Sequence, residues 1–167
     1  AIASQAQIAV ELADSVIFVV DALTGLTQTD ERIVKLLRQA GKPVTVAVNK
    51  IDDQISEYMA AEFWKLGLGE PYPISAMHGR GVGDLLDEAV AQMKSAEKTS
   101  GFLTPSHLRR VALVGRPNVG KSSLLNQLSH SERSVVNELA GTTRDPVDEI
   151  VTIDGEDYLF IDTAGIK

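Results

Sequence analysis

The chain has 167 residues, 44% of them hydrophobic and 23% charged, with a formal net charge of −7 and no cysteine. This composition excludes a disordered or collagen-like chain, a disulfide scaffold and a thiolate zinc site; it is compatible with a reducing cytosol and argues mildly against a large nucleic-acid-binding face. The longest apolar run, Val16–Val20, is too short to span a bilayer, which needs about 20 residues.

The first part of the chain alternates between helical spacing and short apolar runs. In chain order we predict helix Ala1–Ala13, strand Val16–Val20, helix Thr27–Ala40, strand Pro43–Val48, helix Ser56–Leu66, strand Pro73–Ser75 and helix Gly83–Ala96. The segment Lys98–Leu108 has no periodicity and contains Thr, Ser, Gly, Pro and His, so it is predicted to be a linker.

The second part continues the same alternation. In chain order we predict strand Arg109–Val114, a glycine-rich turn, helix Lys121–Leu128, a polar stretch over Ser129–Arg144, and strands Val147–Ile153 and Tyr158–Ile161 around an Asp154-Gly155 hairpin turn. Strands that alternate with helices predict an α/β fold, in which helices cover both faces of a mainly parallel sheet.

The strongest chemical motif is Gly115-Arg116-Pro117-Asn118-Val119-Gly120-Lys121-Ser122, which has glycine, four residues and then Gly-Lys-Ser between a strand and a helix. Backbone N–H groups of such a loop surround a β-phosphate at the helix N-terminus. Lys121 would reach the β- and γ-phosphates, and Ser122 would bind Mg²⁺. The alternative is a glycine turn with a surface lysine, which the strand–turn–helix context disfavours. Nucleotide binding is expected at Gly115, Asn118, Val119, Gly120, Lys121, Ser122 and Ser123.

Two later segments could complete a phosphate and magnesium site. Asp162 ends a buried strand about 40 residues after the loop and could hold a magnesium-bound water, while the Gly165 N–H could reach a γ-phosphate. In Gly141-Thr142-Thr143-Arg144-Asp145, the Thr143 hydroxyl could complete the magnesium shell. The alternative for this segment is a flexible loop.

A base-binding segment follows the strand Pro43–Val48. The Asp52 carboxylate could accept hydrogen bonds from N1 and the exocyclic amino group of guanine, a pair that adenine does not offer. Asn49 would connect this loop to the phosphate loop, and the Lys50 stem would lie along the base. Ser75 and Ala76 end the third strand, where the Ala76 N–H could contact the guanine oxygen. Each segment alone is typical of an ordinary solvated loop.

Together the motifs resemble a translation-factor-class GTPase, and specifically the Der (EngA) family of bacterial GTPases that carry two GTPase domains in tandem. The stretches that carry the resemblance are Val19–Ala22, Gly25–Thr27, Gly69–Ala76, His78–Gly81, Gly115–Ser122, Gly141–Asp145 and Asp162–Lys167. They extend over essentially the whole chain. The resemblance implies guanine-nucleotide binding with Mg²⁺, hydrolysis of GTP to GDP, a cytoplasmic location, and a role with rRNA in assembly of the large ribosomal subunit.

The order of the motifs differs from that of an ordinary GTPase, because the base-binding motifs precede the phosphate-binding ones. The resemblance places residues 1–97 on the back half of a first GTPase domain, residues 98–108 on the linker, and residues 109–167 on the front half of a second. We therefore expect a piece of a longer protein whose two parts close into one permuted domain; the alternative is a swapped dimer. The expected order of six strands, all parallel except the first, is Val147–Ile153, Tyr158–Ile161, Arg109–Val114, Val16–Val20, Pro43–Val48, Pro73–Ser75.

Two other GTPase families share some of these features. Naturally permuted GTPases of the YlqF type share the motif order but usually carry proline where this chain has Ala164. The tRNA-modifying GTPases of the MnmE type share the Asn-containing phosphate loop and Gly141–Asp145, but usually lack the stretch Gly69–Ala76. A non-enzymatic interaction fragment that binds no nucleotide is the alternative from another functional class.

For catalysis, the resemblance implies roles for Lys121, Asn118, Thr143 and Gly165. Asn118 would hold a potassium ion that offsets charge developing in the transition state, and the alternative is an asparagine that only stabilises the loop. Ile166 stands where many GTPases place a water-orienting glutamine. That side chain cannot orient the water here. The switch segment is cut beyond Lys167, so hydrolysis by this chain alone is expected to be slow or absent.

Overall fold

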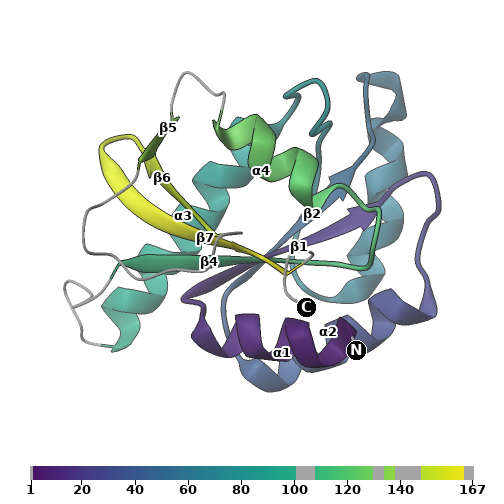
Figure 1. Ribbon diagram of the computed structural model, residues 1–167. Coiled ribbons are helices and arrows are strands. Elements are labelled where there is room, and N and C mark those ends of the chain that lie inside the picture. Colours follow the sequence, from purple (N-terminus) through teal and green to yellow (C-terminus); the bar gives the residue numbers. More distant parts are fainter. Residues whose placement is uncertain (1, 101–107, 130–133, 138–147, 164–167) are drawn as a thin grey trace.

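The computed structural model describes residues 2–100, 108–129, 134–137 and 148–163, which contain one seven-stranded sheet of order β3-β2-β1-β4-β7-β6-β5 (Figure 1). The strands are β1 Ser15–Asp21, β2 Val44–Asn49, β3 Pro71–Pro73, β4 Arg109–Val114, β5 Ser134–Asn137, β6 Glu149–Ile153 and β7 Glu156–Asp162. Strands β3, β2, β1, β4 and β7 pair in parallel, whereas β6 is antiparallel to both β7 and β5.

The six strands predicted from the sequence are all present, in the predicted spatial order and with β6 as the antiparallel strand. A seventh strand, β5, extends the sheet beyond β6. Its four residues, Ser-Val-Val-Asn, are too few for an alternating pattern to stand out in a polar stretch. β3 lies two residues before its predicted position, because the ladder pairs Val46 with Pro71 and Val48 with Pro73, while Ser75 pairs with Arg80 instead.

The helices are α1 Ile2–Leu12, α2 Gln28–Ala40, the 3-10 helix η1 Ile55–Leu66, α3 Val82–Ser100 and α4 Lys121–Ser129. α3 continues three residues into the predicted linker, because polar residues such as Lys98 are tolerated at the exposed end of a helix. α2 begins at a capping box, in which Thr27 and Asp30 satisfy each other's backbone N–H groups, and it ends at Gly41 in the left-handed conformation. No helix in the described ranges is both long and apolar enough to cross a membrane.

Two hydrophobic cores lie on opposite faces of the sheet. Successive strand residues alternate between them, so Phe18 belongs to the core under α1, α2 and η1, and Ile17 belongs to the core under α3 and α4. Both cores draw residues from β1 and β2 and also from β4 and β7. The two parts of the chain therefore share the packing on each face.

The two parts meet along the parallel ladder between β1 and β4, which pairs Ser15 with Val111 and Phe18 with Val114. At its start, the Asp14 N–H donates to the Arg110 carbonyl (2.8 Å), and the Arg110 N–H donates to an Asp14 carboxylate oxygen (2.9 Å). This ladder brings the carboxyl ends of β1, β2 and β4 to one edge of the sheet. Ligands of open α/β sheets bind at that edge.

The shared sheet predicts cooperative unfolding. Leu113 is fully buried in β4, whereas Trp64, the chain's single tryptophan, lies in η1 of the other part. Leu113→Ala should lower the free energy of unfolding by about 3 kcal/mol, because it removes buried methyl groups and leaves a cavity. Urea transitions followed by Trp64 fluorescence and by far-UV circular dichroism should shift together.

Ile55→Ala is the matched control, because this η1 side chain is 86% exposed. Its free energy of unfolding should change by less than about 0.5 kcal/mol. A Leu113→Ala fluorescence transition that stays in place while the dichroism transition shifts would show that the two parts unfold independently.

Candidate functional site

A cleft of about 630 Å³ opens at the carboxyl ends of β1, β2 and β4. Both parts of the chain line it. The lining residues are Leu23, Asn49, Lys50, Asp52, Ser75, Met77, Pro117, Asn118, Gly120, Lys121, Ser122 and Ser123. The structure therefore brings most of the predicted base-binding and phosphate-binding residues to a single cleft.

Asn49, the last residue of β2, connects the two sides of the cleft. Its Nδ2 donates to the Val119 carbonyl (2.8 Å), and its Oδ1 accepts from the Ala76 N–H (2.9 Å). A Cβ on Gly120 would lie 2.1 Å from Asn49 Nδ2, and the Gly120 φ of +108° also disfavours a side chain. The predicted link between the base-side loop and the phosphate loop is present.

Ala76 and Val119, two of the predicted nucleotide-binding residues, are not among the residues that line the cleft. Both are buried. The Ala76 N–H, for which the sequence suggested a contact with the guanine oxygen, donates to Asn49 here, so the base contact stays a prediction. The Ala76 N–H therefore helps to hold the Asn49 side chain in position. This role depends on the rotamer of Asn49, which the sequence does not reveal.

Asp52 lines the cleft together with the phosphate loop. The Ser75 hydroxyl donates to its Oδ1 (2.7 Å) and accepts from the His78 N–H (3.2 Å). Ser75 is buried, whereas the Asp52 side chain is 58% exposed. The hydroxyl orients one carboxylate oxygen of a group that otherwise remains accessible to a ligand.

The sequence did not single out Asp21 as a site residue, although it ends β1 directly beside Asn49 in the sheet register. Lys50 Nζ donates to Asp21 Oδ2 (2.7 Å) and to the Asn118 carbonyl (3.2 Å). Burial alone would raise the pKa of Asp21, but Lys50 and the N–H groups of Leu23 and Thr24 lower it below its ordinary value. Its position at a carboxyl strand end was the signal that could have found it.

The phosphate loop also contacts the first part of the chain through Arg116. Its Nη2 lies 3.9 Å from Asp21 Oδ2, and its Nε lies 3.7 Å from Oδ2 of the fully buried Asp30. The Arg116 side chain is only 16% exposed. This arginine therefore pairs the phosphate loop with carboxylates at the end of β1 and the start of α2.

Lys121 begins α4 and is buried, with its Nζ donating to the carbonyls of Gly115 (2.6 Å) and Arg116 (3.0 Å). A Cβ on Gly115 would lie 2.5 Å from the Val19 carbonyl oxygen, so the loop passes too close to β1 for any larger residue. Burial lowers the pKa of Lys121, while Asp162 raises it and Arg116 lowers it further. The helix N-terminus and this ammonium together favour an anion.

Ser122 and Asp162 lie side by side, with the Ser122 hydroxyl donating to Asp162 Oδ2 (3.2 Å). A hydroxyl and a carboxylate are oxygen donors of the kind that Mg²⁺ prefers, so this pair fits the predicted metal site. No group of three or more His, Cys, Asp or Glu side chains suited to a metal occurs among the residues that the structure describes. The predicted site residues Thr143 and Gly165 lie outside the described residues.

Asn118 has a φ of 68°, in the left-handed region that few residues other than glycine and asparagine adopt readily. The residue lines the cleft, and its carbonyl accepts from Lys50. Its backbone conformation is by itself a reason for asparagine at this position. The conformational role and the predicted potassium role are both compatible with this geometry.

Two family models match the chain, in the order that the motifs suggested. A model described as "Elongation factor Tu GTP binding domain" matches residues 3–95, and one described as "50S ribosome-binding GTPase" matches residues 110–167. The first match covers more than half of the chain.

Curated relatives named GTPase Der match over essentially the whole chain. The identity is 81% over 167 residues for the protein of Bifidobacterium longum and 54% over 166 residues for that of Streptomyces coelicolor. The chain spans 36% of the length of each of these relatives.

Among solved structures, the fold is similar to that of YjeQ from Thermotoga maritima. The TM-score is 0.54 at 22% sequence identity, and the match covers 89% of this chain and 48% of that one. At this identity the likeness concerns the fold alone.

The burial of Lys121 predicts a dependence of stability on pH. Its pKa in the folded chain lies below the ordinary value of 10.5, so the unfolded chain binds more protons between these two values. The contribution of Lys121 to stability should therefore rise with pH through that window. Lys121→Met lacks this titration and serves as the reference. The urea midpoint of the wild type minus that of Lys121→Met should be larger at about pH 10 than at about pH 8. A difference between the two midpoints that falls as pH rises would contradict this prediction.

Proposed function

Because the chain belongs to the family of GTP-binding domains represented by that of elongation factor Tu, we propose that its cleft binds guanine nucleotide together with Mg²⁺. The observation that carries this proposal is the pair of hydrogen bonds made by Asn49. They hold the base-side residues Asp52 and Ser75 and the phosphate loop as walls of one cleft. The base would contact Asp52, and the phosphates would lie at the N-terminus of α4.

We infer that the two parts of the chain correspond to two different GTPase domains of a longer protein. The separate matches of residues 3–95 and 110–167, and the length of the Der relatives, support this assignment. Residues 1–97 would be the back half of a first domain, residues 98–108 the linker, and residues 109–167 the front half of a second. The β1–β4 ladder supports closure into one permuted domain within a single chain.

For the parent protein we propose hydrolysis of GTP to GDP in the cytoplasm. Lys121 would move from its carbonyl partners to the β- and γ-phosphates, and its positive charge would stabilise negative charge on the transferred phosphoryl group. Ser122 and Asp162 would hold Mg²⁺, which when bound neutralises phosphate charge. Thr143 and Gly165 retain their proposed roles toward the magnesium ion and the γ-phosphate.

A partner on the large ribosomal subunit is proposed from the family model described as "50S ribosome-binding GTPase" and from the resemblance of the motifs to the Der family. In the basic pair Arg109-Arg110 at the start of β4, the Arg109 side chain is not free to contact RNA. Arg109 Nε donates to Glu97 at 2.7 Å, and its side chain is only 16% exposed. The surfaces that contact the ribosome are therefore expected mostly outside this chain.

Asp52→Asn tests the guanine assignment. The substitution replaces an acceptor oxygen by an amide donor that would face the N1 and amino donors of guanine. Affinity for GDP should fall at least about a hundredfold, because buried donors lose their partner, while affinity for ADP should hardly change. Titration with fluorescent GDP and ADP measures both.

Asp53→Asn is the matched control, since Asp53 is the adjacent carboxylate, does not line the cleft, and accepts from the Ser56 N–H instead. Its affinity for GDP should equal that of the wild type. A wild-type chain that binds GDP no better than ADP would refute the guanine proposal and favour an interaction fragment without nucleotide.

Asn118→Gly separates the two roles of Asn118, because glycine keeps the left-handed backbone and removes only the amide. If the amide helps to hold K⁺, fluorescent GDP with aluminium fluoride, which mimics the transferred phosphoryl group, should bind the wild type more tightly in K⁺ than in Na⁺. The variant should lose this difference. A variant that keeps it would leave Asn118 only its role in the loop conformation.

Co-sedimentation with large ribosomal subunits tests the partner. We expect this chain to bind weakly near physiological salt, and a full-length relative to bind more tightly with a non-hydrolysable GTP analogue than with GDP. Contacts dominated by phosphates would also weaken steeply with salt. Tight, salt-resistant binding by the 167-residue chain would place the ribosome-binding surface within it.

A further inference from the structure

A second groove, of about 650 Å³, lies between α2 and η1 on the surface of the α1, α2 and η1 layer. It shares no lining residue with the nucleotide cleft. Aliphatic groups line its base, contributed by the half-buried Leu26 and the buried Val34 and Leu66. Its walls are two helices already fixed by the core beneath them.

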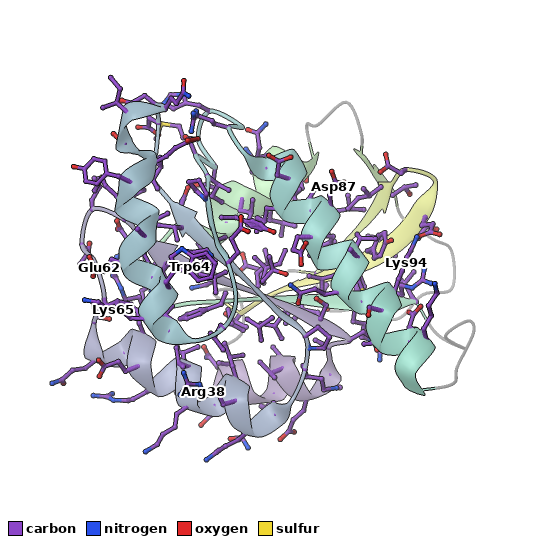
Figure 2. The ribbon with its side chains drawn as sticks, turned by 180° about the vertical axis from the view of Figure 1, so that it is seen from behind. Arg38, Glu62, Trp64, Lys65, Asp87 and Lys94 are labelled. Carbon is purple, nitrogen blue, oxygen red and sulfur yellow. The ribbon has the colours of Figure 1, made fainter. Side chains whose placement is uncertain are left out.

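Two hydrogen bonds connect the α2 side of the groove to η1. The Leu26 N–H donates to Glu62 Oε1 (3.2 Å), and the Arg38 guanidinium donates to the Leu66 carbonyl. Figure 2 shows Glu62 and Lys65 on η1 and Arg38 on the neighbouring helix α2. The groove is therefore formed before any partner binds, which reduces the entropy lost on binding.

The groove is strongly positive on a chain whose net charge is −7. Arg32, Lys35, Arg38 and Lys65 line it, and Glu31 contributes the one carboxylate among its described lining residues. Arg32, Lys35 and Arg38 follow one another at three-residue spacing and so lie along one side of α2. Within the part of the chain that the structure describes, Arg32, Lys35 and Lys65 form no ion pair, and all three are exposed.

We propose that this groove docks an acidic protein segment, whose carboxylates pair with Arg32, Lys35 and Lys65 and whose aliphatic side chains contact Leu26 and its neighbours. Charge complementarity selects an anionic partner. Among the residues that the structure describes, no aromatic side chain lines the groove to stack a nucleobase, and its aliphatic base gives apolar side chains a surface to cover. These two features favour an acidic polypeptide over single-stranded RNA.

The test uses a short fluorescein-labelled peptide helix with leucines along one side and flanking glutamates, measured by fluorescence anisotropy with the full 167-residue chain. A peptide with glutamine in place of glutamate should bind about tenfold more weakly, because several exposed ion pairs are lost together. An oligouridine RNA should not compete with the glutamate peptide.

Lys35→Glu and Lys65→Glu reverse one charge on each wall and should each weaken binding about fivefold. Lys98→Glu, on the exposed end of α3, makes the same change of net charge and should leave affinity within about twofold. Far-UV circular dichroism and the thermal midpoint confirm that all three variants fold. Failure of the glutamate peptide to bind, equal losses in all three variants, or tighter binding of RNA would each overturn the proposal.

GDP titration of the same variants keeps this inference separate from the proposed nucleotide function. Lys35, Lys65 and Lys98 do not line the cleft, so GDP affinity should match the wild type in every variant. Loss of peptide binding with GDP binding intact supports the groove alone. A chain that binds peptide but no GDP would refute the nucleotide function and leave the groove standing.

Discussion

The parallel ladder between β1 and β4 is the contact on which the nucleotide cleft depends. It joins segments about 95 residues apart in the chain. Through the registers of β1 with β4 and of β1 with β2, it also brings the end of β2 beside the phosphate loop. Asn49 can reach the Val119 carbonyl only in this register. A shift of one residue would turn β4 side chains to the opposite face and break both cores, so packing and site geometry select the same pairing.

Several residues of the cleft are not the ones that would give the most stable fold. Lys121 is buried and donates to two backbone carbonyls, and burial of an ammonium disfavours its charged form. Gly115 and Gly120 avoid clashes with the Val19 carbonyl and the Asn49 amide. A buried charge and glycines fixed by close approach are features that a sequence retains for a ligand, because apolar packing would serve the fold better.

The strand order and the main motifs were predictable because each rests on local signals: a short apolar run, a Gly-Lys-Ser turn, and a resemblance that extends over both parts. The partners of individual side chains could not be predicted in this way. Arg116 pairs with Asp21 across the seam between the two parts, and Lys50 of the first part pairs with the same carboxylate. This arrangement requires the register of three strands. The sequence did not predict β5, and it placed β3 two residues too late. Both strands have only three or four residues, which is too few for a periodic pattern, so their positions depend on pairing with the neighbouring strand.

The first turn of α2 connects the two candidate binding surfaces. Asp30 caps this helix through Thr27, and the same carboxylate lies 3.7 Å from Arg116 of the phosphate loop. A few residues further along α2, Arg32 and Lys35 line the basic groove. The groove belongs wholly to the first part of the chain, whereas the cleft needs both parts. Arg116 with Asp30 is a side-chain contact through which the phosphate loop could affect the groove, because it alone pairs that loop with α2 among the ion pairs of the described residues.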